Sequence, residues 1–571
     1  MKLKKVMRMA YNSLEEVPED IKNKLEKYFT HVGGDTFAIH GLPAELTGGA
    51  LARYSRARTG LQLTLINEFF DEHGEPSQEK GAALMDRVLN AFGDDSVGEL
   101  EGTHLGLENV SQLLTKEIED RRIGGSPIEQ STRYVVYDQK DAQGKWRYLR
   151  PKEIIDAGNK DNKESNKYFQ QFEQVNDLVF EVYSEGVQRL KKYFEEQAPR
   201  ENFQIEVERE GKKVLAGEKE LCSPEEKKAF RLAYNFTIRC AALDVGRCVL
   251  PASTLTHLGI HGNGRFYTHL ISSLKSSSLR EAQERGFAVE RELQKVIPTY
   301  IKRNKIDEQQ EKIRNRMKII ATELFAGITP QAEKVTLVPN AEYLDTTLAS
   351  CLFPYTTISL EQIFAVLQQL PQEKKQKIFK SYAGERKSRR DRNGRGLEAG
   401  YPLFFDLVGG FAEYRDLERH RILTQQRQVL TPDLGFIMPP EILAVGLKKE
   451  VEEVVSCMED LNNNLRHAGL EDAAQYATLF NHRLRFMMGM NLREFQHLAE
   501  LRSQPAGHFS YRSMVMEMAQ AVQQRDPWTE IFLGFVDYSD PGNKISRAHE
   551  QAKIAGKNLA AGIDGGVDFK S

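Results

Sequence analysis

The feature that most constrains this chain is a seven-residue pattern that occurs twice. Residues 263–269 (Asn-Gly-Arg-Phe-Tyr-Thr-His) and 491–497 (Asn-Leu-Arg-Glu-Phe-Gln-His) share the spacing Asn-x-Arg-x-x-x-His. Self-similarity within one chain signals duplication, so each half is expected to build a similar unit. We therefore interpret the sequence as two tandem halves, 1–330 and 331–571, which meet within 326–345, a stretch whose Gly and Pro residues are typical of a boundary.

A second informative stretch is 411–428, which places Arg419, His420 and Arg421 side by side. Its apolar residues, the last of them Leu423, predict a helix with these basic side chains at its end. Two guanidiniums that flank an imidazole are costly to hold together unless a phosphate or an electron-rich ring binds there. They could instead complement the helix dipole and cap the last carbonyls, and from spacing alone this second interpretation is the stronger.

Composition bounds the partners that the chain can have. Its 79 Lys and Arg residues nearly balance its 82 Asp and Glu residues, which gives a net charge of -3. This balance argues against attraction of the whole molecule to nucleic acid or to an anionic membrane, so any anion site must be local. The basic run 374–395 carries few aromatic residues and is interpreted as a solvated face or loop.

The cysteines and the apolar runs indicate the compartment. The five cysteines are scattered and lack a Cys-x-x-Cys pair, which predicts neither a disulfide framework nor a zinc site. Polar and acidic residues interrupt the basic N-terminus before an apolar segment forms, and no run of 18 apolar residues occurs. We expect a soluble, cytoplasmic protein with no metal site, no nucleic acid partner and no membrane contact.

Apolar periodicity predicts a helix-rich α+β fold with a small central antiparallel sheet in each half. Helices are expected in the ranges 13–29, 78–92, 164–195, 224–246, 278–325, 359–383 and 443–490. Residues 203–217 predict a hairpin closed at Glu210-Gly211, and 133–137 and 145–150 are strand-like. Pro251 should end the helix of 224–246 and leave Arg247 near its end.

A loop at 121–134 carries polar residues in alternation. Glu129, Ser131 and Arg133 stand at every second position. On an extended segment, this alternation would place all three side chains on one face.

These blocks resemble the flavin-dependent thymidylate synthases, the ThyX family, whose hallmark is Arg-His-Arg-x-x-Ser-x-Asn-Glu-x-Ser-x-Arg-Tyr. The chain is similar to two ThyX units in tandem, each of them degenerate. The first copy keeps Arg121, Ser126, Glu129, Ser131, Arg133 and Tyr134 but has Arg122, Ile123 and Ile128 at three hallmark positions. The second copy keeps Arg419, His420 and Arg421, then departs at Arg427, Val429 and Thr431.

The family's downstream pattern, Ala-Arg-x-Val-Leu-Pro followed by Asn-x-Arg and Leu-Arg, is divided in the same way. The first half matches at Arg247 but has Leu274 where the family has a nucleotide-binding Arg. The second half matches at Arg502 but has Gln475 where the family has its earlier Arg. The losses are complementary, so a site formed between the halves could be complete. The first half also carries an insertion near 140–225.

The resemblance implies an enzyme that methylates dUMP to dTMP with FAD, taking a methylene group from methylenetetrahydrofolate and reducing power from NADPH. Substrate-binding residues would be Glu129, Ser131, Arg133, Arg247 and Arg502, and Arg502 would also stabilise charge during catalysis. Ser131 would hydrogen-bond the substrate and not act as a nucleophile. Cofactor-binding residues would be Arg419, His420, Arg421, Asn491, Arg493, His497, Asn263, Arg265 and His269.

The resemblance also implies an assembly and leaves alternatives open. Because family members are tetramers with shared sites, this chain is expected to form a homodimer that mimics the tetramer. Related alkylation or hydroxymethylation of a pyrimidine nucleotide is a nearby variant of the activity. A different class also stays open, namely a non-catalytic flavin- or nucleotide-binding relative, or a partner of an intact synthase.

Overall fold

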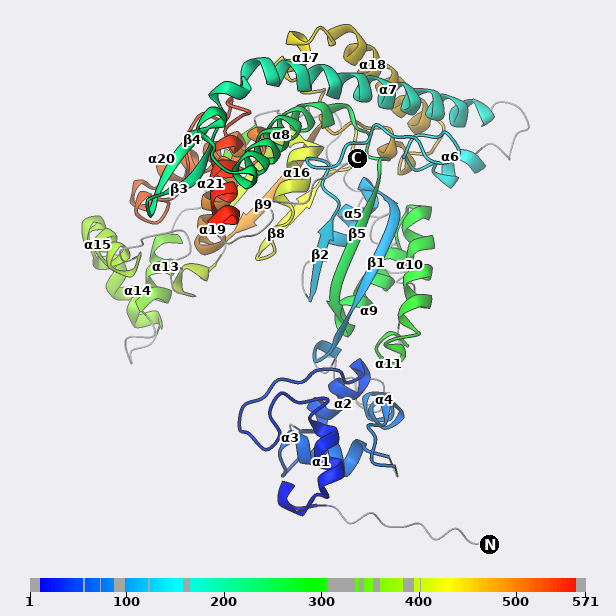
Figure 1. Cartoon of the computed structure of the whole chain (residues 1–571), viewed down its shortest axis with the longest axis vertical. Coiled ribbons are helices and arrows are strands. Elements are labelled where there is room, and N and C mark those ends of the chain that lie inside the picture. The colour runs from blue at the N-terminus through cyan, green and yellow to red at the C-terminus, as the bar shows by residue number, and fades with distance from the viewer. Residues whose placement is uncertain are drawn as a thin grey trace. The chain divides into compact units, whose positions relative to one another are not determined.

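The computed structural model describes residues 11–54, 57–71, 73–86, 98–121, 124–157, 165–302, 304, 306, 334–337, 343–352, 360–383, 395–400 and 402–560. Contacts divide the chain into two compact units (Figure 1). Unit I is drawn from 1–110, 114–129 and 256–327, and unit II from 111–113, 130–255 and 328–571. Residues 130–255 of the first tandem half therefore pack with second-half residues. The boundary of sequence similarity near 330 stays a prediction.

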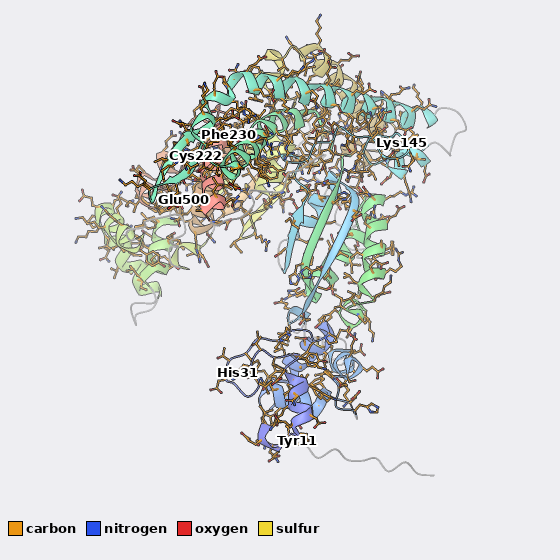
Figure 2. The ribbon with its side chains drawn as sticks, in the orientation of Figure 1. Tyr11, His31, Lys145, Cys222, Phe230 and Glu500 are labelled. Atoms are coloured by element: carbon orange, nitrogen blue, oxygen red, sulfur yellow. The ribbon has the colours of Figure 1, made fainter. Side chains whose placement is uncertain are left out.

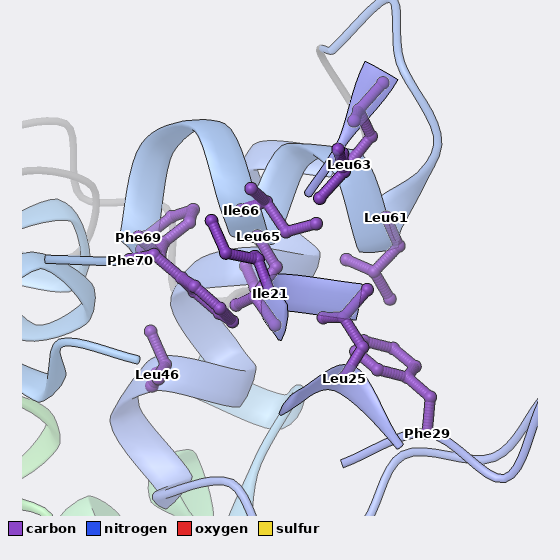
Figure 3. Close-up of a cluster of buried hydrophobic side chains, with 12 residues drawn as sticks. Ile21, Leu25, Phe29, Leu46, Leu61, Leu63, Leu65, Ile66, Phe69 and Phe70 are labelled. Atoms are coloured by element: carbon purple, nitrogen blue, oxygen red, sulfur yellow. The ribbon is translucent and has the colours of Figure 1, made fainter. Parts of the chain in front are cut away.

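Unit I is rich in helices, and those nearest its start share one hydrophobic core. Its helices are α1 (Glu19–Leu25), α2 (Ala44–Tyr54), α3 (Leu61–Thr64), α4 (Gln78–Asp86), most of α5 (Gln112–Glu119), α9 (Gly264–Lys275), α10 (Arg280–Leu293) and α11 (Pro298–Ile301). Figure 3 shows how Ile21, Leu25, Leu46 and Phe70 converge from α1, α2 and the segment after α3. The predicted helix of 13–29 is shorter than expected because Pro18 precedes the first turn of α1.

Unit I also contains a three-stranded antiparallel sheet in the order β1-β5-β2. Its strands are β1 (Gly102–Ser111), β2 (Gly125–Glu129) and β5 (Leu255–Asn263). The β2–β5 register runs from the pair Gly125 and Gly262 to the pair Glu129 and Leu258. The chain thus passes from β1 through α5 to β2, and β5 inserts between them (Figure 1).

Unit II contains a four-stranded sheet in the order β6-β7-β9-β8. Its strands are β6 (Val335–Leu337), β7 (Leu403–Gly410), β8 (Leu423–Arg427) and β9 (Arg483–Met490), and α16 (Phe411–Leu417) joins β7 to β8. The central strand β9 leads into α19 (Leu492–Arg502), as β5 leads into α9. Each unit therefore has the same strand-helix-strand pair around a central strand, which confirms the α+β class and supports duplication.

The remaining helices of unit II surround this sheet and a separate hairpin. They are α6 (Lys152–Asp156), α7 (Ser165–Gln197), α8 (Pro224–Gly246), α13 (Tyr343–Leu352), α14 (Leu360–Gln369), α15 (Gln372–Ala383), α17 (Pro440–Ala444), α18 (Lys448–His467), α20 (Phe509–Arg525) and α21 (Arg547–Ala560). The hairpin of β3 (Gln204–Arg209) and β4 (Lys212–Gly217) turns at Glu210 and Gly211, which have φ of 50° and 74°. Positive φ at both positions fits a type I′ turn, so the predicted hairpin is confirmed.

The helix α8 also matches its prediction closely. Ser223 caps its N-terminus by accepting the Glu226 N–H, and the Glu226 side chain bonds back to the cap. At the other end the helix stops before Pro251, with Arg247 at its C-cap. These local signals place the backbone of Arg247 at the end of α8.

Several predicted elements differ from the structure. The strands expected at 133–137 and 145–150 are turns and isolated bridges, and 483–490 is the strand β9 instead of helix. In β9 the buried residues Leu484, Phe486 and Met488 recur with period two, which fits a strand and not a helix. Pro371 divides the helix expected at 359–383 into α14 and α15. Residues 87–92, most of 303–345 and part of 374–395 lie outside the described residues.

Side chains on and just before α8 differ in their exposure to solvent. Phe230 is buried, whereas Cys222, just before the helix, is exposed (Figure 2). All five cysteines are free thiols. Within the described part of the chain, no helix has the length and apolarity to span a membrane, and no group of three or more His, Cys, Asp or Glu side chains is placed to hold a metal ion.

Candidate functional site

The hallmark segment 121–134 changes direction after β2. The strand ends at Glu129, and the Ser131 carbonyl accepts the N–H groups of Tyr134 and Val135 at 3.2 and 3.0 Å. The Ser131 hydroxyl accepts the Arg133 N–H at 3.2 Å, a local bond that competes with an extended backbone. The expectation that Glu129, Ser131 and Arg133 share one face of a strand is therefore wrong.

Glu129 belongs to unit I and is buried there. Its carboxylate accepts hydrogen bonds from Lys116 Nζ at 3.1 Å and Thr115 Oγ1 at 3.5 Å. Lys116 also bonds Glu119, so one buried ammonium serves two carboxylates. Ser131 and Arg133 belong to unit II.

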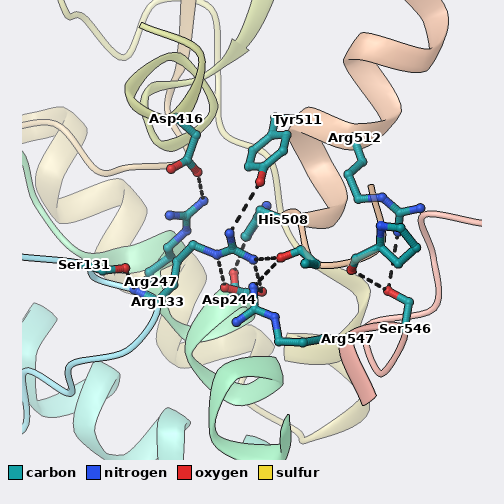
Figure 4. Close-up of polar contacts among 12 residues, drawn as sticks. Ser131, Arg133, Asp244, Arg247, Asp416, His508, Tyr511, Arg512, Ser546 and Arg547 are labelled. Atoms are coloured by element: carbon teal, nitrogen blue, oxygen red, sulfur yellow. Dashed lines mark hydrogen bonds and ion pairs between the residues drawn. The ribbon is translucent and has the colours of Figure 1, made fainter. Parts of the chain in front are cut away.

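Arg133 forms a two-pronged ion pair with Asp244 of α8. Its Nε and Nη2 donate to the two carboxylate oxygens at 2.7 and 2.9 Å, and both side chains are buried (Figure 4). Burial raises the pKa of Asp244. The charge and hydrogen bonds of Arg133 lower it by more than burial raises it, so this pKa lies well below its usual value. Asp244 is therefore ionised at neutral pH.

Arg247 forms the second ion pair of this region. Its Nη2 donates to Asp416 Oδ2 of α16 at 2.9 Å, and the side chain is only 2% exposed. Its Nε is buried and has no hydrogen-bond partner among the described residues. Burial raises the pKa of Asp416, but the charges of Arg247 and Arg133 more than offset this, so the pKa is strongly lowered.

His508, at the N-cap of α20, packs against the same pairs. Its Nε2 lies 2.8 Å from the Asp244 carbonyl oxygen, and its Nδ1 accepts the Ser510 N–H at 3.2 Å. These partners assign the ring proton to Nε2. Burial and the Arg247 charge lower the pKa of His508 to about 3, so the ring is neutral.

Arg547, the first residue of α21, completes the group. Its Nη2 donates to the Ala506 carbonyl at 2.7 Å and lies 3.9 Å from Asp244 Oδ2. We call Arg133, Asp244, Arg247, Asp416, His508 and Arg547 the arginine cluster. With His508 neutral, three guanidiniums face two carboxylates, which leaves one positive charge in a buried site.

Acidification is expected to lower the stability of the folded protein, because His508 is buried in its neutral form. An unfolded histidine has a pKa of about 6.5, so between about pH 6.5 and 3 the unfolded chain binds one more proton than the folded chain. His508 thus contributes stability above pH 6.5 that is lost as pH falls, with a slope of up to about 1.4 kcal/mol per pH unit. Unfolding by urea at several pH values should show a flatter profile for His508→Gln, whose amide can reproduce both hydrogen bonds. Parallel profiles for the two proteins would contradict this assignment.

The segment around His420 is not one continuous helix. The helix α16 ends at Leu417, and Leu423 begins β8, so the helix predicted through Leu423 is wrong. His420 is buried, and its Nδ1 lies 2.7 Å from Glu494 Oε1 while its Nε2 accepts Arg502 Nε at 3.0 Å. Both ring nitrogens are thus used by side chains of α19, so His420 does not cap α16.

The protonation of His420 follows from the same contacts. Because Nε2 accepts from a guanidinium, the proton is on Nδ1 and is donated to Glu494. Burial and the Arg502 charge lower the pKa of His420, which outweighs the opposite effect of Glu494. The neutral, buried imidazole of His420 therefore lies between two exposed residues, Arg419 and Arg421.

The two groups of residues meet at Tyr511 of α20. The guanidinium carbon of Arg133 lies 5.9 Å from the centre of the Tyr511 ring, and that of Arg502 lies 5.8 Å from it. Arg502 in turn donates to His420. Arg133 from the first hallmark copy and His420 from the second are therefore linked through two side chains within unit II.

The repeated Asn-x-Arg-x-x-x-His pattern has the same local structure in both copies. Asn263 and Asn491 cap α9 and α19 through their side-chain oxygens, which accept the N–H groups three residues ahead at 2.8 and 2.9 Å. The following arginines pair with carboxylates, Arg265 with Glu99 at 2.5 Å and Arg493 with Glu398. The final histidines, His269 and His497, are exposed.

The positions that depart from the hallmark are accommodated locally where the structure describes them. Leu274 is buried in α9, and Ile128 is 76% exposed on β2. Gln475 Oε1 accepts a hydrogen bond from Arg427 Nη1 at 3.3 Å. These two residues, which both differ from the family pattern, therefore contact each other. Arg122 and Ile123 lie outside the described residues.

Several members of the site were not predicted from the sequence. Asp416, His508, Tyr511 and Arg547 stand in stretches without a distinctive pattern. Asp244 had a usable signal, because it is the single carboxylate in the apolar end of α8 and a buried carboxylate requires a partner.

A cavity of about 610 Å³ lies next to the start of α20, in the size range of small-molecule sites. Its lining comprises Lys334, Val408, Glu413, Ile437, Arg483, Phe509, Ser510, Ser513, Pro541 and Gly542. The lining includes the two residues that follow His508 but no predicted site residue. The arginine cluster, and not this cavity, holds the predicted residues.

Comparisons with known proteins show which family the chain resembles. A family model described as "Thymidylate synthase complementing protein" matches residues 49–299 and 408–528, one segment in each half. The chain is 34% identical to a UPF0159 protein of Chlamydia muridarum over 540 residues, which are 91% of this chain and 95% of the relative. A UPF0159 protein of Chlamydia pneumoniae is similar to the same extent, and one of Thermoplasma acidophilum is 29% identical over 520 residues, 90% of this chain and 99% of the relative.

Proposed function

The chain belongs to the thymidylate synthase complementing family, the ThyX family, and from this premise we propose that it is a flavin-dependent thymidylate synthase. The reaction would be the reductive methylation of dUMP to dTMP in the cytoplasm. Methylenetetrahydrofolate would provide the methylene carbon, and NADPH would provide reducing equivalents through FAD. The observation that carries the proposal is the approach of Arg133 and Arg502, from opposite halves, to one Tyr511 ring.

The arginine cluster supports binding of the substrate phosphate. It has three guanidiniums for two carboxylates, and the buried Nε of Arg247 lacks a partner among the described residues. A phosphate would neutralise the surplus charge and accept donors in the forked geometry that arginine offers. Each such charge-assisted bond contributes about 1.5 to 3 kcal/mol when well aligned.

Arg502 supports the chemical step. Its Nε is held by His420, which fixes the guanidinium beside Tyr511. A positioned cation next to the uracil ring would stabilise negative charge that develops on the ring carbonyls. The neutral state of His420 matters here because a charged ring would repel Arg502 and lose its acceptor nitrogen.

The Arg419, His420 and Arg421 segment fits a flavin phosphate group. Arg419 and Arg421 are exposed, and the buried imidazole between them holds the backbone in place through Glu494 and Arg502. These two arginines would bind the diphosphate, with Asn491, Arg493 and His497 on the adjacent α19 as further contacts. Reduced flavin, when bound, supplies the hydride of the reaction. We also propose Glu129 as a substrate contact and Asn263, Arg265 and His269 as cofactor contacts, in a protein that forms a homodimer.

A second candidate is a non-catalytic nucleotide- or flavin-binding relative. One observation favours it: Asp244 and Asp416 already occupy the guanidiniums of Arg133 and Arg247. If these pairs never open, the arginines would serve stability and not substrate binding. Titration of the purified protein with dUMP, followed by turnover with all co-substrates, separates the two candidates.

Loss of the flavin is expected when Arg421 is replaced by alanine. The purified protein should be yellow with a flavin spectrum, and Arg421→Ala should be colourless because one of two exposed phosphate-binding guanidiniums is gone. The matched control is Arg427→Ala, which alters a nearby arginine at a departed hallmark position and should keep its colour. The wild-type protein should also rescue a thymidine-requiring strain. A wild-type protein that cannot be reconstituted with FAD would contradict the proposal.

A further inference from the structure

We propose that Arg547, in the C-terminal helix, is a positioning residue that sets the affinity of the site for the substrate phosphate. This inference rests on the proposed function and extends it to a residue outside the family motifs. The stretch Ser539–Arg547, named the C-terminal strap here, brings Arg547 to the arginine cluster. Arg547 shares the negative charge of Asp244 with Arg133. The charge of Arg133 is then only partly neutralised and can attract an anion.

The contacts of Arg547 are shared with Arg133. Both guanidiniums point to Asp244 Oδ2, Arg133 Nη2 at 2.9 Å and Arg547 Nη2 at 3.9 Å. Both also donate to the Ala506 carbonyl, at 3.4 and 2.7 Å (Figure 4). One carboxylate therefore serves two cations and cannot neutralise both of them.

The setting makes this competition strong. Arg547 is 5% exposed, and the space lined by Asp244, Arg512 and Arg547 measures only about 10 Å³. That volume is at the lower limit for one water molecule, so the charges act through a medium that screens them weakly. Without Arg547, Asp244 would pair with Arg133 alone, and the arginine cluster would lose its surplus positive charge.

The position of Arg547 in its own helix argues against a role in helix stability. It is the first residue of α21, where the positive end of the helix dipole disfavours a cation. The acidic residue of the first turn, Glu550, has the favourable sign. Arg547 is thus placed for its contacts with Asp244 and Ala506, at a small cost to α21.

Polar contacts tie the C-terminal strap to the rest of unit II. Arg512, which is fully buried, donates to Ser539 Oγ at 3.1 Å and to Ser546 Oγ at 3.4 Å. Lys544 pairs with Glu441 at 2.9 Å and lies 3.8 Å from the centre of the Phe509 ring. These contacts hold the strap against unit II where it brings Arg547 to the arginine cluster.

The body of α21 is anchored independently of the strap. It packs on β3 and α8, where a Cβ added at Gly556 would lie 2.6 Å from the Glu206 Cβ. The close approach requires glycine at this position. Replacing Arg547 should therefore leave α21 in place.

The test compares Arg547→Met, which removes the charge but keeps much of the volume, with Arg547→Lys, which keeps the charge. Affinity is measured for dUMP and separately for inorganic phosphate, and KM and kcat are measured for dUMP. Arg547→Met should weaken binding of both probes and raise KM about tenfold with kcat and the flavin spectrum retained. Arg547→Lys should recover affinity to within about threefold of wild type, because the charge carries the effect.

The control is Lys553→Met in the same helix, where the side chain is 41% exposed and pairs with Glu550. It should leave both affinities unchanged. Equal affinity of wild type and Arg547→Met for both probes would overturn the role of Arg547, as would a kcat loss with unchanged KM. A wild-type protein that binds phosphate but neither binds dUMP nor turns it over would instead refute the proposed function.

Discussion

Replacing Arg502 with alanine is expected to slow thymidylate formation by about 100- to 1000-fold while the protein stays folded. The substitution removes a cation from beside Tyr511 and the donor to His420 Nε2. Loss of one positioned donor to a developing negative charge lowers kcat by about 100- to 1000-fold. Loss of the proposed contact with the uracil ring should also weaken dUMP binding. Steady-state kinetics and dUMP titration measure the two effects.

The same variant has a spectroscopic signature. The Arg502 charge is one cause of the lowered pKa of His420, and Glu494 acts in the opposite direction. Without Arg502, the pKa of His420 should rise, which NMR titration of the imidazole signals can follow. The control is Arg466→Ala on α18, whose partner Asp433 is exposed, and it should change neither kinetics nor this pKa. An unchanged His420 titration in Arg502→Ala would contradict the contact.

Replacing Asp244 with alanine is expected to cause the largest loss of stability. The change leaves Arg133 and Arg547 in a buried site without their shared carboxylate, and breaking a buried pair in this way costs about 3 to 5 kcal/mol. The comparison is Glu218→Ala, whose partner Arg200 is 42% exposed. A surface pair of this kind contributes about 1 kcal/mol or less.

Urea unfolding at neutral pH measures both variants. A midpoint for Asp244→Ala close to that of Glu218→Ala would show that the Arg133 pair contributes little. Asp244→Asn provides a second comparison, because the amide keeps the shape of the side chain but not its charge. It should fall between wild type and Asp244→Ala, since one amide oxygen can still accept from Arg133.

The ion pairs of the cluster also decide between the two candidate functions. A carboxylate that occupies an arginine is compatible with substrate binding if the surplus cation can attract the phosphate. Arg547 provides that surplus in the structure. The stability of the pairs and the affinity for dUMP are therefore linked, and comparing the Asp244 and Arg547 variants shows how strongly.

Local sequence patterns alone determined much of the framework. The limits of α8 follow from the Ser223 cap and from Pro251, and the hairpin follows from Glu210-Gly211. The repeated asparagines mark the starts of α9 and α19 in both halves. The limits of α8 and the hairpin turn depend on residues within one or two turns of each other, so spacing is enough to predict them.

Only the tertiary structure decided how the site is paired. Arg133 meets Asp244 across 111 positions of sequence, and Arg247 meets Asp416 across 169. Such partners are selected by burial, since a charge removed from water must find an opposite charge wherever the fold brings one. The sequence identified which arginines were retained in each half. Their carboxylate partners, the neutral state of His420 and His508, and the approach of both halves to Tyr511 depend on packing between distant segments, which no local pattern encodes.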